Sequence, residues 1–353
     1  MKNYFLIFAG VLMVASCTTK QPHITFSGNV PGLNDGTFLV TDSAGQNLAG
    51  QNITNGTFKI DTILENKGYG SFTLQKNGEK AAPVEVYLEP GQYTIEASVK
   101  HLDQYPNIKS SSAIQNDLTA YYTTQEKIIE KKMNSVFGIR EKLDMDKLKL
   151  EAFQSFIKQH PDSKAAAHLM LGLNYEKDAE AYSAIYSKLN TDVKNTEEGK
   201  FIGNKLGVMM KLLPGATGPG IAGKTPDGKA FDQSQLNKRV YVVEFWKAGN
   251  QVSRLNHQDM IKSLLKNVDV SKVGFISISM DTKREWWTKA IADDKLSWPQ
   301  YSDLKGDDSA DAERWAITKV PTYYILNGKW QIVQRDVDFG KLEATINDYL
   351  SKR

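Results

Sequence analysis

Ser253 and His257 are the two side chains whose types and spacing could form a nucleophile and its base. They are four residues apart on a helix that the sequence predicts over 252–265, so they share one face of that helix. A serine beside a general base is the core of a catalytic nucleophile. Helical neighbours seldom reach the geometry of a positioned triad, however, and no nucleophile-elbow motif surrounds Ser253. We therefore expect solvated or capping roles for both residues.

Metal and nucleic-acid sites are not predicted. The formal net charge is only +3, and no basic run alternates with aromatic residues, as a nucleic-acid surface would require. We do not expect a metal, because the five histidines lack the spacing of metal ligands; they are His23, His101, His160, His168 and His257. We expect no other cofactor.

The single cysteine, Cys17, follows a short apolar stretch over 4–15 and a Val-Ala-Ser tripeptide. An apolar stretch that ends in small residues is typical of a secretory signal. A cysteine at this place resembles the lipobox of bacterial lipoproteins. The resemblance implies a signal peptide over 1–16, lipidation of Cys17 and a lipidated tether over 17–22, so that acyl chains hold the protein on a membrane. We expect a cell-envelope protein on the periplasm-facing side of the outer membrane.

The same cysteine count limits redox chemistry. Dithiol exchange requires an attacking thiolate and a resolving thiol. The mature chain has no cysteine besides Cys17. It can therefore neither form an internal disulfide nor exchange one by itself.

The residues around Ser253 follow a strand predicted over 240–245, within a C-terminal segment over 214–353. The segment begins with a linker rich in glycine and proline, 214–220. Further strands are predicted over 274–280 and 323–326, with helices between the strands and a hairpin and a helix at the end. This order predicts a three-layer α/β domain, in which helices flank a central sheet.

Two other segments precede this domain. The residues over 23–109 form short strands between turns, including Asn55-Gly56, which is the strongest short hairpin signal. They predict an all-β, sandwich-like domain or a small barrel. The residues over 110–213 place apolar side chains at helical spacing and predict a helical connector. We expect the β-rich domain to be a structural or interaction module.

Two stretches resemble a known family, and a third resembles a domain that commonly precedes it. RVYVVEFWKAGNQVSRLNHQDM, over 239–260, is similar to the motif region of membrane-tethered thiol-disulfide oxidoreductases of the TlpA/ResA type, within the thioredoxin-like and AhpC/TSA group. The stretch over 275–326 resembles the Bacteroidetes branch of that family. YLEPGQYTIEA, over 87–97, resembles a small N-terminal domain of unknown function in Bacteroidetes lipoproteins. Together the resemblances imply a thioredoxin-like C-terminal domain behind that small domain.

The departure from the family lies at its reactive cysteines. They would fall on Asn250 and Ser253, so the usual CxxC motif is replaced by Asn250-Gln251-Val252-Ser253. Gly249 takes the place of the usual aromatic residue before the motif. Asparagine is a preferred residue at a helix N-cap. The sequence therefore predicts a degenerate motif without catalytic residues, whose first position caps the helix.

The resemblance also implies a groove beside this motif. The family carries a cis-proline that faces the active loop, which we expect at the Val320–Pro321 bond. An extended peptide can lie in such a groove without any thiol. The expected groove residues are Trp246, Gly249, Asn250, Val320 and Pro321.

Glu244 falls where thioredoxins place a buried acid that moves protons for the dithiol. Three arrangements are open for it. Burial would raise its pKa, an ion pair with Lys247 would neutralise it, and a position at the strand end would let it reach solvent. The first arrangement would make Glu244 a candidate catalytic acid.

We expect a membrane-anchored, thioredoxin-fold lipoprotein without redox cysteines. Its predicted role is binding or scaffolding of an envelope protein or peptide, because the family's reactive atoms are absent. The alternative is an enzyme related to the thiol-disulfide oxidoreductases. It would act with a thiol from a partner, or through Glu244 in a non-redox reaction.

Overall fold

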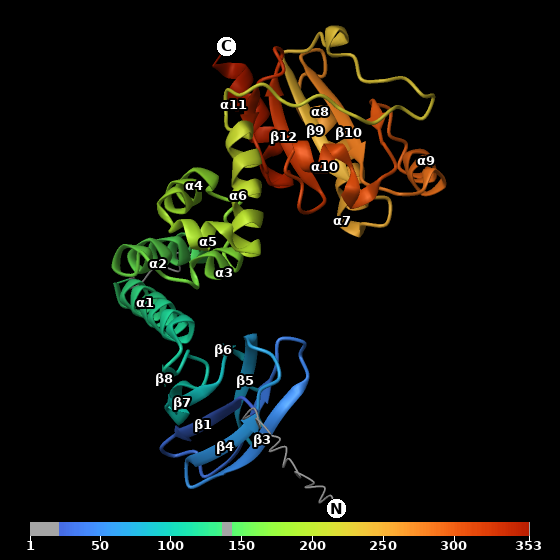
Figure 1. Ribbon diagram of the computed structural model, residues 1–353. Coiled ribbons are helices and arrows are strands. Elements are labelled where there is room, and N and C mark those ends of the chain that lie inside the picture. The colour runs from blue at the N-terminus through green and yellow to red at the C-terminus, as the bar shows by residue number, and fades with distance from the viewer. Residues whose placement is uncertain (1–20, 136–142, 353) are drawn as a thin grey trace, which may run out of the picture. The chain divides into compact units, whose positions relative to one another are not determined.

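The computed structural model describes residues 21–135 and 143–352, and Figure 1 shows their helices and strands. The chain folds into two compact units, Met1–Ala165 and Ala166–Arg353. The boundary falls within the predicted connector, so that its first two helices belong to one unit and its remaining helices to the other.

The predictions for the extreme N-terminus, namely the signal peptide over 1–16 and the lipidation of Cys17, lie outside the described residues. Within the part of the chain that the structure describes, no helix has both the length and the apolar content to cross a bilayer.

The first unit contains one mostly antiparallel sheet of eight strands, in the order β6-β5-β2-β3-β4-β1-β7-β8. Only β1 and β7 pair in parallel. The predicted Asn55-Gly56 turn joins β3 to β4, and both turn residues have positive φ, 53° and 76°, as a tight hairpin requires. The strands are β1 (His23–Asn29), β2 (Asp35–Thr41), β3 (Asn47–Thr54), β4 (Thr57–Ile63), β5 (Gly68–Lys76), β6 (Val84–Leu88), β7 (Gly91–Glu96) and β8 (Asn107–Ser110).

This sheet curls around its own core. Phe26 on β1 and Phe38 on β2 are separated in the sheet by two strands, yet their ring centroids are 5.7 Å apart. Phe58 stacks on Phe38 with a centroid distance of 4.2 Å. Because alternate residues of each strand point inward, one set of buried side chains fills the interior. The prediction of an all-β, sandwich-like domain is confirmed.

The described part of the first unit also contains two α-helices, α1 (Ala113–Ser135) and α2 (Met145–Gln159). They pack through aromatic side chains. Tyr121 on α1 is buried, and its ring lies edge-on to those of Phe153 and Phe156 on α2, with centroids 6.0 Å and 5.7 Å away.

The second unit begins with four helices, α3 (Ala166–Leu171), α4 (Ala179–Lys188), α5 (Thr191–Asn195) and α6 (Glu197–Met209). Three of them start at side-chain caps: Asp178 for α4, Asn190 for α5 and Thr196 for α6. Each of these side chains accepts a hydrogen bond from a free N–H of the first turn, which fixes where the helix starts.

The rest of the second unit is built on a five-stranded sheet in the order β11-β10-β9-β12-β13. Figure 1 labels β10, β9 and β12, which lie next to one another. The strands β11, β10 and β9 are parallel. β12 pairs antiparallel with β9, and β13 pairs antiparallel with β12. In chain order the elements are β9 (Val240–Trp246), α7 (Gln251–Asp259), α8 (Leu265–Asn267), β10 (Val273–Ser279), α9 (Arg284–Asp293), β11 (Gln300–Tyr301), α10 (Ala310–Arg314), β12 (Thr322–Asn327), β13 (Ile332–Gln334) and α11 (Leu342–Ser351).

Both faces of this sheet are covered. On one face, Val242 and Ile325 pack in a cluster with Met260, which follows α7, and with Ile346 of α11. The opposite face is aromatic, and Phe245 contacts the ring of Trp315 at a centroid distance of 5.6 Å. Three layers, this strand order and the βαβ start followed by a hairpin define a thioredoxin-like fold. The predicted α/β class of the C-terminal domain is confirmed.

Candidate functional site

The degenerate motif lies where β9 ends and α7 begins. Asn250 is the N-cap of α7, because its Oδ1 accepts a hydrogen bond of 2.8 Å from the backbone N–H of Ser253. Its Nδ2 donates to the carbonyl oxygen of Val320, at 3.3 Å. One side chain therefore both starts the helix and ties the motif to the segment before β12. The Val320–Pro321 bond is cis, as predicted.

Most of the predicted groove residues are accessible. Gly249 is exposed, and Asn250, Val320 and Pro321 are half-buried. Trp246 is different, and its assignment to the groove needs correction. Its side chain is fully buried in a cluster with Trp287, Ala290 and Leu296. A residue within the strand points to a covered face of the sheet, so it is not available to a partner.

The expectation of solvated roles for Ser253 and His257 is wrong. Both side chains are fully buried, since their face of α7 packs against the sheet. Among the described residues, Ser253 Oγ has no hydrogen-bond partner. The two nitrogens of His257 are occupied by carboxylates, so the imidazole does not serve as a base for Ser253.

Glu244 is buried, with 1% of its surface exposed, so it does not reach solvent at the strand end. Its carboxylate accepts hydrogen bonds from Ser277 Oγ at 2.6 Å and Tyr323 Oη at 3.1 Å. Lys247 does not pair with it, because the Lys247 Nζ contacts Asp307 Oδ1 at 2.8 Å. The acid is enclosed in the layer between β9 and α7.

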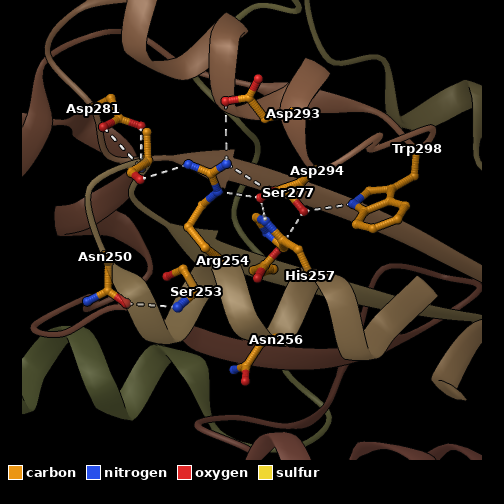
Figure 2. A network of polar contacts seen from close by, with 12 residues as sticks. Asn250, Ser253, Arg254, Asn256, His257, Ser277, Asp281, Asp293, Asp294 and Trp298 are labelled. Carbon is orange, nitrogen blue, oxygen red and sulfur yellow. Dashed lines mark hydrogen bonds and ion pairs between the residues drawn. The ribbon is translucent and has the colours of Figure 1, made fainter. Parts of the chain in front are cut away.

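His257 links Glu244 to a second acid. Its Nε2 lies 3.1 Å from Glu244 Oε2, and its Nδ1 lies 3.0 Å from Asp294 Oδ2. Asp294 also accepts a hydrogen bond of 2.7 Å from Arg254 Nη2. Figure 2 shows Asp294 between Arg254 and His257. We call Glu244, His257, Asp294 and Arg254 the buried charge network.

The network shifts the proton affinities of its members. Burial by itself would lower the pKa of His257, but the hydrogen bonds and charges of Glu244 and Asp294 outweigh burial and raise it. Burial acts to raise the pKa of Asp294, yet the contacts with Arg254 and His257 leave it below its usual value. Burial and the neighbouring Glu244 raise the pKa of Tyr323. The arrangement therefore stabilises an imidazolium between two carboxylates.

Arg254 and a further acid, Asp281, hold the loop before α7. Arg254 Nη1 donates to the carbonyl oxygen of Ala248 at 3.3 Å. The backbone N–H of Ala248 donates to the carboxylate of Asp281, with distances of 3.0 Å and 3.2 Å to its oxygens. Both polar backbone groups of this loop residue are thus fixed by charged side chains.

Sequence reasoning missed Arg254 and Asp294. Arg254 lies three residues before His257 on α7, and this spacing was a usable signal that they share a face. Asp294 is 37 residues from His257. Only the packing of α9 against the sheet brings these two together.

No model of a known protein family matches the chain, and no curated protein sequence matches it. Solved structures similar to it include a thiol-disulfide oxidoreductase from Bacteroides fragilis, 24% identical, covering 38% of this chain and 98% of that one, with a TM-score of 0.34. The thioredoxin domain of a thiol-disulfide oxidoreductase from Bacteroides vulgatus is 24% identical, with coverages of 39% and 98% and a TM-score of 0.36. A thiol:disulfide interchange protein from a Bacteroides species is 26% identical, with coverages of 40% and 93% and a TM-score of 0.35.

These similarities concern the C-terminal part of the chain. The fold itself follows from the strand order, the βαβ start and the closing hairpin of this protein. The C-terminal domain is thioredoxin-like.

Proposed function

We propose that this protein is a lipid-anchored protein of the cell envelope whose thioredoxin-like domain binds a peptide or protein partner without exchanging disulfides. The binding surface is the groove of Gly249, Asn250, Val320 and Pro321. The observation that carries the proposal is the pair of hydrogen bonds made by the Asn250 side chain. At the place of the family's first cysteine stands an amide that caps α7 and bonds to Val320.

The absence of thiols supports a role in binding. The only cysteine in the sequence is Cys17, far from the groove in the chain. Ser253, at the position of the family's second cysteine, is fully buried. Without two thiols, neither the attack on a disulfide nor its resolution can take place in this domain.

The surface next to the motif supports a partner as well. Val252 and Leu255 lie three residues apart on α7, and they are 54% and 50% exposed. Gln251 beside them is also exposed. Apolar side chains that stay in solvent next to a groove are a common feature of contact surfaces. An extended peptide could pair its backbone in the groove and place apolar side chains on Val252 and Leu255.

Catalysis through Glu244 has less support. The carboxylate is enclosed, and its oxygens already accept hydrogen bonds from Ser277, Tyr323 and His257. A general base must come within hydrogen-bond reach of the proton that it removes. A substrate would have to displace these contacts to reach Glu244.

An insulin-reduction assay with dithiothreitol separates binding from redox catalysis. The unaltered protein should leave the rate at the level of dithiothreitol alone, while the variant Asn250→Cys/Ser253→Cys provides a matched protein with two thiols. Turnover above background by the unaltered protein would overturn the proposal and require a thiol from elsewhere.

The partner is tested by co-purification from the native membrane followed by mass spectrometry. Gln251→Arg changes an exposed residue next to the groove without touching the buried charge network, so it should lose the partner and keep its melting temperature. Gln258→Arg makes the same exchange at an exposed position further along α7 and should keep the partner. Equal capture by both variants would rule out this groove.

A further inference from the structure

A second cleft, with a volume of about 460 Å³, opens along the edge of β10. It reaches Tyr241 on β9 and Val273 to Ile276 on β10, at the amino-terminal ends of these parallel strands. Asn250, in contrast, follows the carboxyl end of β9. The cleft and the groove therefore lie at opposite ends of the sheet.

The edge of β10 is open because β11 is short. β11 pairs with β10 only at Ser277 and Ile278, and the N–H of Ser277 donates to the carbonyl oxygen of Pro299 at 3.0 Å. Proline has no N–H, so Pro299 cannot donate a hydrogen bond to β10, and the pairing of β11 with β10 cannot extend toward Phe275. Since alternate residues of a strand present their peptide groups to the same edge, Phe275 directs its N–H and C=O toward the side that β11 does not reach.

The walls of the cleft are rich in aromatic rings. Phe231 and Tyr301 contact each other edge-on with centroids 5.8 Å apart. Phe275 and Trp298 form another pair with centroids 6.1 Å apart. Tyr241 on β9 also lines the cleft. Rings at several angles around one space can offer both faces and edges to another aromatic group.

Gly274 lets the wall form. A Cβ at this position would lie 2.6 Å from a ring carbon of Tyr241 and 3.2 Å from Cγ of Lys238. Real Cβ atoms are not found at the first of these distances from other atoms. The glycine therefore allows the tyrosine ring to lie directly against the backbone of β10.

The charged groups of the lining already have partners. Lys238 Nζ donates to the carbonyl oxygens of Val270 and Ser271, at 3.0 Å and 3.2 Å. The carboxylate of Asp232 accepts a hydrogen bond of 2.9 Å from the N–H of Ser234. The lining holds one cation, Lys238, and one anion, Asp232, so its formal charges sum to zero and give an ion of either sign no net attraction, which favours a neutral ligand.

We infer that this cleft is a binding site for a neutral aromatic ring. Apolar and aromatic walls with a few polar groups, around a space of this size, are the usual features of a small-ligand site. The peptide edge of Phe275 offers a donor and an acceptor to a polar group attached to the ring. The ring can belong to a small molecule or to an aromatic side chain of a peptide, and neither source depends on the groove at Asn250.

Fluorine NMR titrations of the full-length protein in detergent test this site, with protein-free micelles as the blank. Fluoroindole carries the ring alone, N-acetyl-fluorotryptophanamide adds the two peptide groups, and fluorocyclohexane has apolar bulk without aromaticity. Saturable binding of the two aromatic probes and none of fluorocyclohexane is expected. Tighter binding of the amide indicates a peptide source, and tighter binding of fluoroindole a small molecule.

Val270→Trp and Lys266→Trp form a matched pair. Val270 is 51% exposed and lines the cleft, so a larger side chain there should fill its mouth and weaken aromatic-probe binding by about tenfold or more. Lys266 is exposed and does not line the cleft, so the same indole there should leave affinity unchanged. Equal affinity in both variants, no saturable binding, or equally tight binding of fluorocyclohexane would overturn the inference. Unchanged melting temperatures establish that both variants are folded.

Discussion

His257 is the residue on which the buried charge network depends most. It is fully buried between Glu244 and Asp294, so replacing it leaves two carboxylates without their shared cation. Removing one partner of a buried ion pair typically costs about 3–5 kcal/mol of unfolding free energy. We expect a loss of this order in His257→Gln, measured by urea unfolding.

Tryptophan fluorescence suits this measurement, because all six tryptophans lie in the second unit. The control is His168→Gln in the same unit. His168 contacts Glu198 at 2.7 Å, but the two side chains are 20% and 36% exposed, so its loss should cost about 1 kcal/mol or less. Equal losses of unfolding free energy in the two variants would show that the buried charge network stabilises the fold no more than a partly exposed ion pair does.

The raised pKa of His257 predicts how stability depends on pH. The pKa of this imidazole is higher in the folded protein than in the unfolded chain. The stabilising contribution of His257 to the free energy of unfolding is therefore complete below its pKa in the unfolded chain, about 6.5, and is lost as the pH rises through its pKa in the folded protein. For Asp294 the folded pKa is lowered, so its contribution is complete above about 3.9 and is lost as the pH falls through the folded value.

The melting temperature of the second unit should therefore decline on both sides of a central pH range. The charged or titratable groups that face His257 are Glu244 from β9, Asp294 after α9 and Arg254 on α7; Tyr323 from β12 contacts Glu244. In His257→Gln the decline on the alkaline side should disappear. A variant that keeps the same alkaline slope would assign this dependence to another group.

At the scale of elements, the start of α7 is set by one amide. Asn250→Ala removes both the cap to Ser253 and the bond to Val320, and loss of an N-cap costs about 0.5–2 kcal/mol. Asn250→Asp keeps an acceptor for Ser253 and favours the positive end of the helix, but it loses the donor to the Val320 carbonyl. We expect the alanine variant to melt lower than the aspartate variant.

Partner capture by the same two variants separates the two contacts of Asn250. Both should bind the partner more weakly if the bond to Val320 shapes the groove. If the aspartate variant binds as well as the unaltered protein, the cap alone is sufficient and the Val320 contact has no role in binding.

Element types were well predicted where periodicity was strong. The buried strand expected over 274–280 corresponds to β10, Val273–Ser279, and the helix expected over 252–265 corresponds to α7 with its π-helical and short helical continuation. β11 was not predicted. Two residues give too little pattern to identify, and their strand character depends on pairing with β10.

At the scale of the whole molecule, the anchor is the feature that decides location. If Cys17 carries the lipid, Cys17→Ser should move the protein to the soluble fraction or leave its precursor uncleaved, as shown by fractionation and acyl labelling. Ser16→Thr, which keeps the cysteine, is the control and should remain on the membrane. Unchanged labelling in Cys17→Ser would exclude lipidation at this residue.

The sequence by itself determined several properties of this protein. It excluded dithiol chemistry, because a count of cysteines does not depend on the fold. It also predicted the α/β class of the C-terminal domain and the capping role of Asn250, because periodicity and capping are local properties.

Only the tertiary structure decided which polar residues are buried together. Glu244, His257 and Asp294 belong to a strand, a helix and a helix end far apart in the chain, and no local pattern encodes their contact. The same holds for Trp246, which was expected in the groove and lies in the core. Whether a side chain meets solvent, a partner or another charge depends on how the layers pack, and packing is a property of distant segments.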